Sequence, residues 1–163
     1  MTRRIAFIVI SFLTALAACS GSADSDNTRN AEAVSMQHTE IWSKGNMELV
    51  ATVYAENYVG HFPGGTTVTG RDGIQAAVTS HRAAFPDWIE EIQEILVEGN
   101  HVATHYRSTA THLGSFQGIP ASGNRVEITE ASIYRMANGQ IAEQWAYPDV
   151  MNLMQQITAD TQN

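Results

Sequence analysis

The spacing of apolar residues changes near the middle of the chain, from a helical period to a strand period. Between residues 31 and 56 the apolar positions fall near helical spacing and are interrupted at Gly45-Asn46, which predicts a helix, a kink and a second short helix. A further helix is predicted from Gly73 to Phe85, because Ile74, Ala77, Val78, His81 and Phe85 share one face. We expect Asp72 to cap this helix and Pro86 to end it.

The second half of the chain predicts a sheet. Residues 88–98 and 101–112 are extended runs joined by Gly99-Asn100, and residues 126–136 and 140–147 are joined by Asn138-Gly139. Both dipeptides are hairpin-turn signals. A shorter hairpin is expected from 58–62 to 66–69, a Gly- and Pro-bearing loop at 114–123, and a final helix at 150–157. Helices followed by a meander of long strands predict the α+β class, with the helices on one face of a curved sheet.

The amino terminus has the pattern of an export signal. Arg3-Arg4 precede an apolar run, residues 5–16, that is too short to span a bilayer, and Leu16-Ala17-Ala18-Cys19 matches the cleavage box of lipoproteins. Cys19 is the only cysteine, which suits an acyl anchor and excludes an internal disulfide. The alternative is an ordinary secretory signal cut after Ala18. We therefore expect a lipoprotein signal peptide (1–18) and an exported, membrane-anchored protein of the cell envelope.

The remaining chain divides into a tether and one domain. Residues 19–30 are small and polar without an apolar period, which predicts a flexible tether. Residues 31–158 are long enough for one domain with one core, and 159–163 form a tail. Without residues 1–18 the chain has 7 basic and 17 acidic residues, a net charge of −10. An acidic chain with no basic cluster argues against a nucleic-acid partner.

Several motifs from residue 58 to 157 resemble one known family. They are Phe85-Pro86-Asp87, Glu98-Gly99-Asn100, the run from Thr111-His112 through Gly118-Ile119-Pro120, Tyr134-Arg135, Asn138-Gly139-Gln140-Ile141, Trp145, and Asp149 followed by Leu153 and Gln156. In order and spacing they resemble the SnoaL-like polyketide cyclase (ester cyclase) family of the nuclear-transport-factor-2-like superfamily. The resemblance implies a cone-shaped α+β fold with one deep pocket, and an acid at the position of Asp149 that takes a proton from carbon before ring closure, without a cofactor.

The chain departs from the family pattern at three places. His105 stands where the family often has Arg, Ala110 where it often has Gly, and Pro120-Ala121-Ser122-Gly123 where Pro-Pro-Thr-Gly is common. We expect the first of these positions to face the pocket, so that it affects which substrate is bound.

Asp149 is the predicted general base. To act near neutral pH it has to lie among apolar groups such as Trp145 and Tyr147. The alternative is that Asp149, directly before the last helix, is only its N-cap.

His61 and His105 are predicted partners of a substrate carbonyl or enolate. Either could instead be a polar residue satisfied in or near the core. The predicted pocket wall consists of Trp145, Tyr58, Trp88 and Tyr134. A metal site is not expected, because His101 and His105 stand about 13 Å apart along one strand and no carboxylate–histidine group has a known ligand spacing.

Two functions follow as hypotheses. The first is cofactor-free acid–base chemistry, such as intramolecular aldol cyclisation or isomerisation, on a small hydrophobic carbonyl compound. The second is an envelope lipoprotein that binds a small ligand without turnover. The resemblance also implies a homodimer formed through one face of the sheet, which would cover residues such as Ile133 or Ile128.

Overall fold

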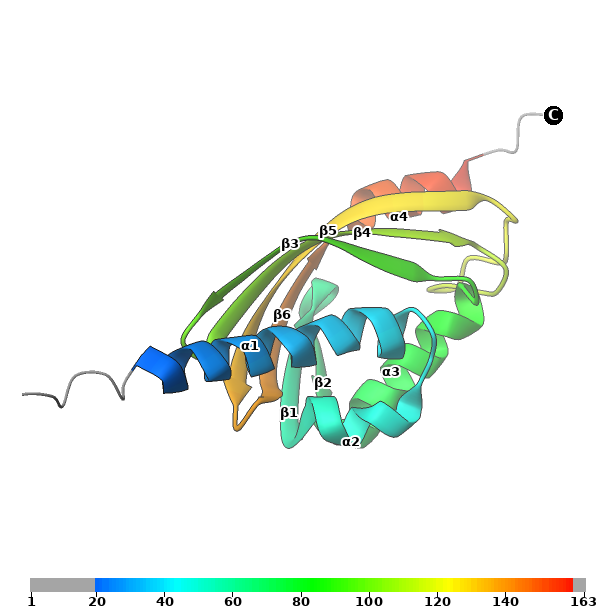
Figure 1. The fold of residues 1–163 in the computed structure, drawn as a ribbon. Helices are drawn as coiled ribbons and strands as arrows, with labels where there is room; N and C mark the ends of the chain where they lie inside the picture. The colour runs from blue at the N-terminus through cyan, green and yellow to red at the C-terminus, as the bar shows by residue number, and fades with distance from the viewer. Residues whose placement is uncertain (1–19, 160–163) are drawn as a thin grey trace, which may run out of the picture.

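A curved sheet with helices on its concave side makes up the described part of the chain (Figure 1). The structure is a computed structural model that describes residues 20–159, with side chains from residue 23 onward. The helical segments are α1 (Ser20–Met36), the π-helical η1 (Gln37–Trp42), η2 (Met47–Leu49), α2 (Val50–Val53), η3 (Pro63–Gly65), α3 (Gly70–Ala84) and α4 (Val150–Thr158). The strands are β1 (Tyr54–Phe62), β2 (Thr66–Thr69), β3 (Ile89–Glu98), β4 (His101–Thr111), β5 (Arg125–Ala137) and β6 (Gln140–Pro148).

The six strands form one sheet in the order β2-β1-β6-β5-β4-β3. Only the β1–β6 pair is parallel, and the other neighbours are antiparallel. The two long hairpins turn at Gly99-Asn100 and Asn138-Gly139, as the sequence predicts. Asn138 and Gly139 both have positive φ, 53° and 76°, which is the geometry that the tight turn between β5 and β6 requires. The predicted α+β cone is confirmed.

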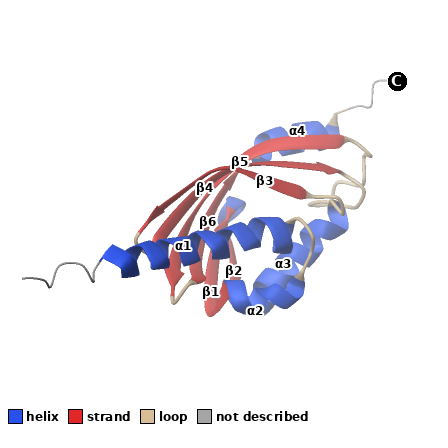
Figure 2. Ribbon diagram, in the orientation of Figure 1, coloured by secondary structure: helices blue, strands red, loops and turns tan. Residues whose placement is uncertain are grey.

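Helices α1, α2 and α3 cover the concave face of the sheet, and α4 lies at its far end (Figures 1 and 2). One apolar cluster joins α1, α2 and α3 to the sheet around Val34, Ile41 and Ile141, all fully buried. A second cluster joins the end of α3 to β4, β5 and α4 around Phe85, Val126 and Ile157. Strict alternation along the strands explains this packing, since every second residue of β5 is buried.

Three predictions about the elements are wrong. Residues 20–30, expected as a tether, form the first turns of α1, because Asn30 donates to the Gly99 carbonyl at 3.1 Å and the next turn buries Ala33 and Val34. The strand β1 begins at Tyr54, inside the expected second helix. The residue before α3 is Thr69, without a side-chain cap, and Asp72 lies in its first turn.

The predicted signal peptide and Cys19 lie outside the described residues. Within residues 20–159, no helix combines the length and apolar character that crossing a membrane requires.

Candidate active site

A cavity of about 240 Å³ opens between the helices and the concave face of the sheet, where the two apolar clusters meet. Its walls are largely aromatic: Trp42, Phe62, Trp88, Tyr106 and Phe116. Ile128, Ala146, Val150 and Leu153 add aliphatic surface. Against this apolar lining stand a few polar side chains, chiefly Glu90, Glu130, His81 and Gln144.

Glu90 on β3 is buried, and three hydrogen bonds fix it, two at its carboxylate and one at its backbone N–H. Nδ1 of His38 lies 2.6 Å from Oε2 of Glu90, and Nε1 of Trp88 donates to Oε1 at 3.0 Å. The backbone N–H of Glu90 donates to Oγ of Ser43 at 2.9 Å. Because a carboxylate only accepts, Nδ1 of His38 is the donor. Two donors on a carboxylate in an apolar wall stabilise its charge.

A chain of hydrogen bonds fixes His38 behind Glu90. Its Nε2 lies 3.0 Å from the Tyr134 hydroxyl, which accepts from Nε2 of Gln37 at 2.9 Å. The Tyr54 hydroxyl donates to Oε1 of Gln37 at 3.0 Å. His38, Gln37, Tyr134 and Tyr54 are all nearly inaccessible to solvent. The imidazole is therefore oriented by buried partners and presents one N–H to Glu90.

Glu130 on β5 is the second carboxyl group of the cavity. Ser108 donates to Oε1, and the Tyr106 hydroxyl lies 3.4 Å from Oε2. Burial, and secondarily the negative charge of Glu90, raise the pKa of Glu130 to about 8, against the smaller lowering by Ser108 and Tyr106. Glu130 is therefore mostly protonated at neutral pH and can donate a proton inside the cavity. The same burial, and the charge of Glu130, raise the pKa of the Tyr106 hydroxyl well above its ordinary value.

His81 on α3 contributes a neutral imidazole to the cavity wall. Its ring packs edge-on against Trp88 at 4.4 Å and against Trp42 at 5.5 Å. Burial, helped by the nearby charge of Arg82, lowers the pKa of His81 to about 4. Among the residues that the structure describes, no hydrogen-bond partner meets Nε2 of His81.

A family model of SnoaL-like polyketide cyclases matches residues 32–157 of the sequence. The chain belongs to this family. A search of curated proteins finds no match. Solved structures share this fold. One of them is a candidate SnoaL-like polyketide cyclase from Jannaschia sp. CCS1, which is 25% identical to this chain with a TM-score of 0.77. The match covers 82% of this chain and 94% of that chain.

Two further SnoaL-like structures are similar. The candidate polyketide cyclase IdmH from Streptomyces antibioticus is 27% identical with a TM-score of 0.71, over 80% of this chain and 99% of that one. A candidate polyketide cyclase from Acidithiobacillus ferrooxidans is 28% identical with a TM-score of 0.72, and the match covers 79% of this chain and 94% of that chain. The SnoaL-like fold and family are thus shown by sequence and structure together.

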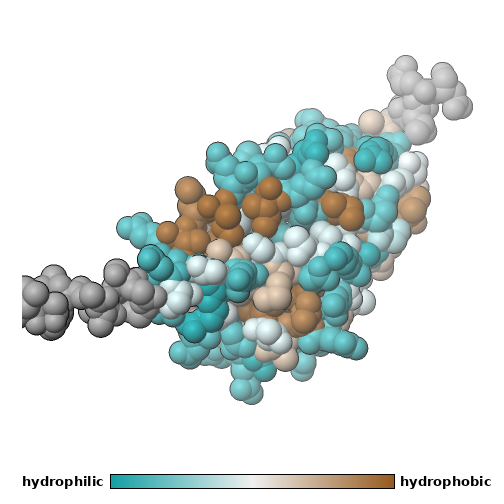
Figure 3. All heavy atoms as spheres, in the orientation of Figure 1, coloured by the Kyte–Doolittle hydropathy of each residue, from teal (hydrophilic) through white to brown (hydrophobic). Residues whose placement is uncertain are grey.

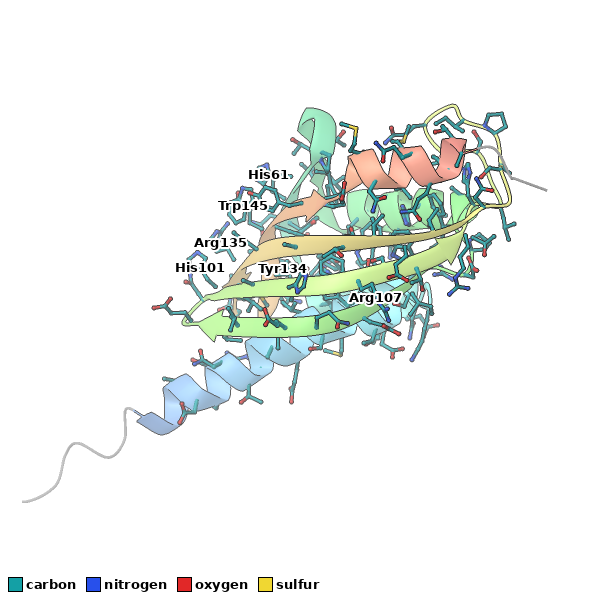
Figure 4. The ribbon with its side chains drawn as sticks, turned by 90° about the horizontal axis from the view of Figure 1, so that it is seen from above. His61, His101, Arg107, Tyr134, Arg135 and Trp145 are labelled. Carbon is teal, nitrogen blue, oxygen red and sulfur yellow. The ribbon has the colours of Figure 1, made fainter. Side chains whose placement is uncertain are left out.

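His61 and Trp145 do not face the SnoaL-like cavity. They stack on each other at 5.4 Å on the outer side of the sheet, where Nε2 of His61 lies 2.9 Å from Oε1 of Glu143. Figure 4 shows His61, Trp145, Arg135 and His101 in a row near one end of the sheet, and they belong to β1, β6, β5 and β4. The reason is strand alternation: the inward residues are Tyr58 and Phe62 on β1 and Gln144 and Ala146 on β6.

The other two predicted catalytic residues also lie outside the cavity. His105 is exposed on β4, between the inward residues Thr104 and Tyr106. Asp149 is exposed and caps α4, because its Oδ1 accepts from the N–H of Asn152 at 3.0 Å. The chain turns from β6 into α4 after Pro148, and this turn directs the carboxylate to the free N–H groups of the helix instead of the cavity. The cap interpretation of Asp149 is the one that the geometry supports.

Three predicted wall residues do lie at or next to the cavity. Trp88 lines it directly. Tyr134 lies behind it, bonded to His38, and Tyr58 donates to Oε1 of the cavity residue Gln144 at 3.0 Å. Ile128, predicted as a residue that a dimer would cover, is instead buried in the cavity wall because it points inward from β5.

Four polar residues of the site were not predicted from the sequence as functional: Glu90, Glu130, His38 and His81. A signal for Glu130 is present in the sequence, since it is the one charged residue in the inward row of β5, whose other members are Val126, Ile128, Ser132, Tyr134 and Met136. An acid in a largely apolar inward row is a buried charged group that requires a partner or a function. His38 gives no such signal, because its partner Glu90 stands 52 positions away in the sequence.

Proposed function

We propose that this SnoaL-like domain transfers protons at a carbon next to a carbonyl group, in a small neutral apolar compound, and so promotes ring closure or isomerisation. One observation carries the proposal. A single apolar cavity holds two buried carboxyl groups in different states, Glu130 with a raised pKa and Glu90 with its charge held by His38 and Trp88. Two such carboxyl groups can divide the roles of acid and base between them.

Glu130 is the proposed acid. With a pKa of about 8 it carries a proton at neutral pH and remains close enough to the working pH to exchange it. It would donate to the carbonyl oxygen of the substrate, where negative charge develops as the enol forms.

Glu90 is the proposed base. Its carboxylate accepts the proton that leaves the substrate carbon, while the electron pair of the C–H bond moves into the new C=C bond of the enol. The N–H of His38 and the indole N–H of Trp88 hold the carboxylate in place. In ring closure the enol carbon then forms a bond to a second carbonyl carbon, and that oxygen takes the proton back from Glu90, while the first oxygen returns its proton to Glu130. In isomerisation the proton returns to another carbon. No atom is lost in either case.

Family membership supports the proposal, since the matching model describes polyketide cyclases. The exposed, capping position of Asp149 favours the second candidate, a binding protein without turnover, because the acid at the position of the family's base does not reach the cavity. The two candidates differ in whether a bound ketone loses its α-protons.

The test is exchange of the methyl protons of 2-acetylnaphthalene in deuterated buffer, followed by NMR. We expect the protein to accelerate exchange above the buffer rate. Glu130→Gln and Glu90→Gln should each reduce the acceleration at least about a hundredfold, the lower end of the range of about 10²–10⁴ that positioned acid–base groups supply.

The matched controls are Asp149→Asn and His105→Gln, which change groups outside the cavity and should leave the acceleration unchanged. Exchange at the buffer rate, with the ketone shown to bind, would establish the binding protein instead. Loss of exchange in Asp149→Asn with full exchange in Glu90→Gln would show that Asp149, and not Glu90, is the base.

A further inference from the structure

The unpaired imidazole of His81 suggests how the cavity chooses its ligand. The ring lies in the cavity wall, and Nε2 is buried without a hydrogen-bond partner in the described part of the chain. A buried polar atom left without a bond costs free energy unless a ligand or water satisfies it. His81 therefore marks a position where a ligand group can supply a missing bond.

His81 and the carboxyl groups are arranged along one aromatic wall. Trp88 lies between them, since its indole ring packs against His81 at 4.4 Å and its N–H donates to Glu90 at 3.0 Å. A flat ligand against Trp88 would thus have the carboxyl pair near one end and His81 near the other. Trp42, Phe62 and Phe116 provide further aromatic surface for such a ligand.

The volume of the cavity limits the size of this ligand. About 240 Å³ is available. A cavity of about 150 Å³ holds one benzene ring, and drug-sized ligands occupy about 300–1,000 Å³. The cavity therefore fits one or two fused rings and is too small to enclose four.

The charges in the cavity limit the polar groups of the ligand. A carboxylate would face the charge of Glu90, so an anion is disfavoured. A neutral imidazole nitrogen is a donor in one tautomer and an acceptor in the other. A hydroxyl group can serve either tautomer, because it both donates and accepts.

We propose that His81 is a specificity-determining residue: the cavity selects a neutral one- or two-ring ketone whose carbonyl meets Glu130 and whose hydroxyl group, at the opposite end, bonds to the imidazole of His81. This inference rests on the proposed function for the position of the carbonyl, whereas the contribution of His81 is a property of binding alone.

The experiment compares the affinities of 6-hydroxy-2-acetylnaphthalene and 2-acetylnaphthalene, measured by quenching of tryptophan fluorescence. We expect the wild-type protein to bind the hydroxyl compound about tenfold more tightly, which corresponds to one well-formed hydrogen bond. His81→Phe keeps an aromatic ring but removes both nitrogens, so the two affinities should agree within about twofold. His81→Gln, which can both donate and accept, should restore part of the preference. The four-ring compound 1-acetylpyrene should not compete.

A readout that needs no variant guards against misfolding of His81→Phe. In ¹⁵N-labelled wild-type protein, the imidazole resonances of His81 should shift with the hydroxyl compound and much less with 2-acetylnaphthalene. Equal affinities in the wild-type protein, an unchanged preference in His81→Phe, or failure of both ketones to bind would overturn the proposal. Tighter binding of the cation 2-(aminomethyl)naphthalene than of the hydroxyl compound would also overturn it.

The two proposals can fail separately. A preference for the hydroxyl compound that depends on His81, without catalysed exchange, would refute the proposed function and leave the specificity of binding in place. Catalysed exchange without that preference would refute the role of His81 alone.

Discussion

Nδ1 of His38 and Oε2 of Glu90 lie 2.6 Å apart, and they join the helical layer to the edge strand of the sheet. His38 belongs to the π-helical segment η1, and Glu90 to β3. This hydrogen bond holds the Glu90 carboxylate in the cavity wall, and the N–H of His38 stabilises its negative charge. The arrangement leads to predictions about stability, about the residues outside the cavity and about the titration of Glu130.

The stability of the protein should pass through a broad maximum between about pH 5 and 6, where the opposing effects of Glu130 and His81 cancel. The pKa of Glu130 is raised to about 8 in the folded state, so its contribution to stability is full below its ordinary value near 4.5 and is lost as the pH rises through 8. The pKa of His81 is lowered from 6.5 to about 4, so stability is lost as the pH falls from 6.5 towards 4. Thermal unfolding from pH 4 to 9 measures both limbs.

Two variants separate these limbs. Glu130→Gln should reduce the loss of melting temperature on the alkaline side by at least about 3 °C, because roughly 1 kcal/mol corresponds to a few degrees in a domain of this size. His81→Phe should flatten the acid side only. An alkaline limb that is the same in Glu130→Gln and in the wild type would show that Glu130 does not carry the proton.

Asp149 should affect stability and not chemistry. Asn can also cap a helix, so Asp149→Asn should unfold at nearly the wild-type temperature, whereas Asp149→Ala should cost about 1 kcal/mol through loss of the bond to the Asn152 N–H. Urea denaturation of both variants measures this difference. Equal stability of Asp149→Ala and the wild type would contradict the capping role.

The alternation of side chains explains what the sequence could predict and what it could not. The strands, their two long hairpins and the class of fold follow from patterns within about ten neighbouring residues, as at Asn138-Gly139. The face on which a residue lies depends on the phase of each strand, and His61, His105 and Trp145 are one position away from inward residues. If the phase of a strand is predicted wrongly by one residue, side chains on the outer side of the sheet are predicted to face the cavity. This is what happened for these three residues.

Pairs that are distant in sequence account for the rest of the site. The acidic character of Glu90 and Glu130 is visible in the sequence, but their burial and mutual influence arise only when β3 and β5 share one cavity. In the same way, the polar residues 20–30 give no apolar period, and α1 is docked through contacts such as that of Asn30 with the distant Gly99.

The outer side of the sheet should form the interface of a homodimer. The strand register aligns Leu96, Ala103, Ile133, Trp145 and His61 across β3, β4, β5, β6 and β1. Leu96 and Ile133 are 69% and 43% exposed, and Figure 3 shows apolar side chains along the side where β3 lies. Light scattering should give the mass of a dimer for the mature protein.

The variant Ile133→Glu should reduce this mass to that of a monomer, because a charge would be buried in the interface. Met151→Glu, at a 72% exposed position on α4, is the matched control and should remain dimeric. A monomer mass for the wild-type protein at micromolar concentration would refute the interface.

Cys19, which lies outside the described residues, should become the acylated first residue of the mature protein. The wild-type protein should incorporate a palmitate probe and fractionate with membranes, and Cys19→Ala should do neither. Unlabelled wild-type protein in the soluble fraction would contradict this prediction.

The titration of Glu130 tests the central claim most directly, because the proposed acid must hold its proton in the empty cavity at neutral pH. The carboxyl carbon of Glu130 can be followed by NMR in ¹³C-labelled protein and assigned with Glu130→Gln. We predict a midpoint near 8, and a lower value in Glu90→Gln, which removes the second cause of the shift but not the burial. A midpoint at or below the ordinary value near 4.5 would contradict the account.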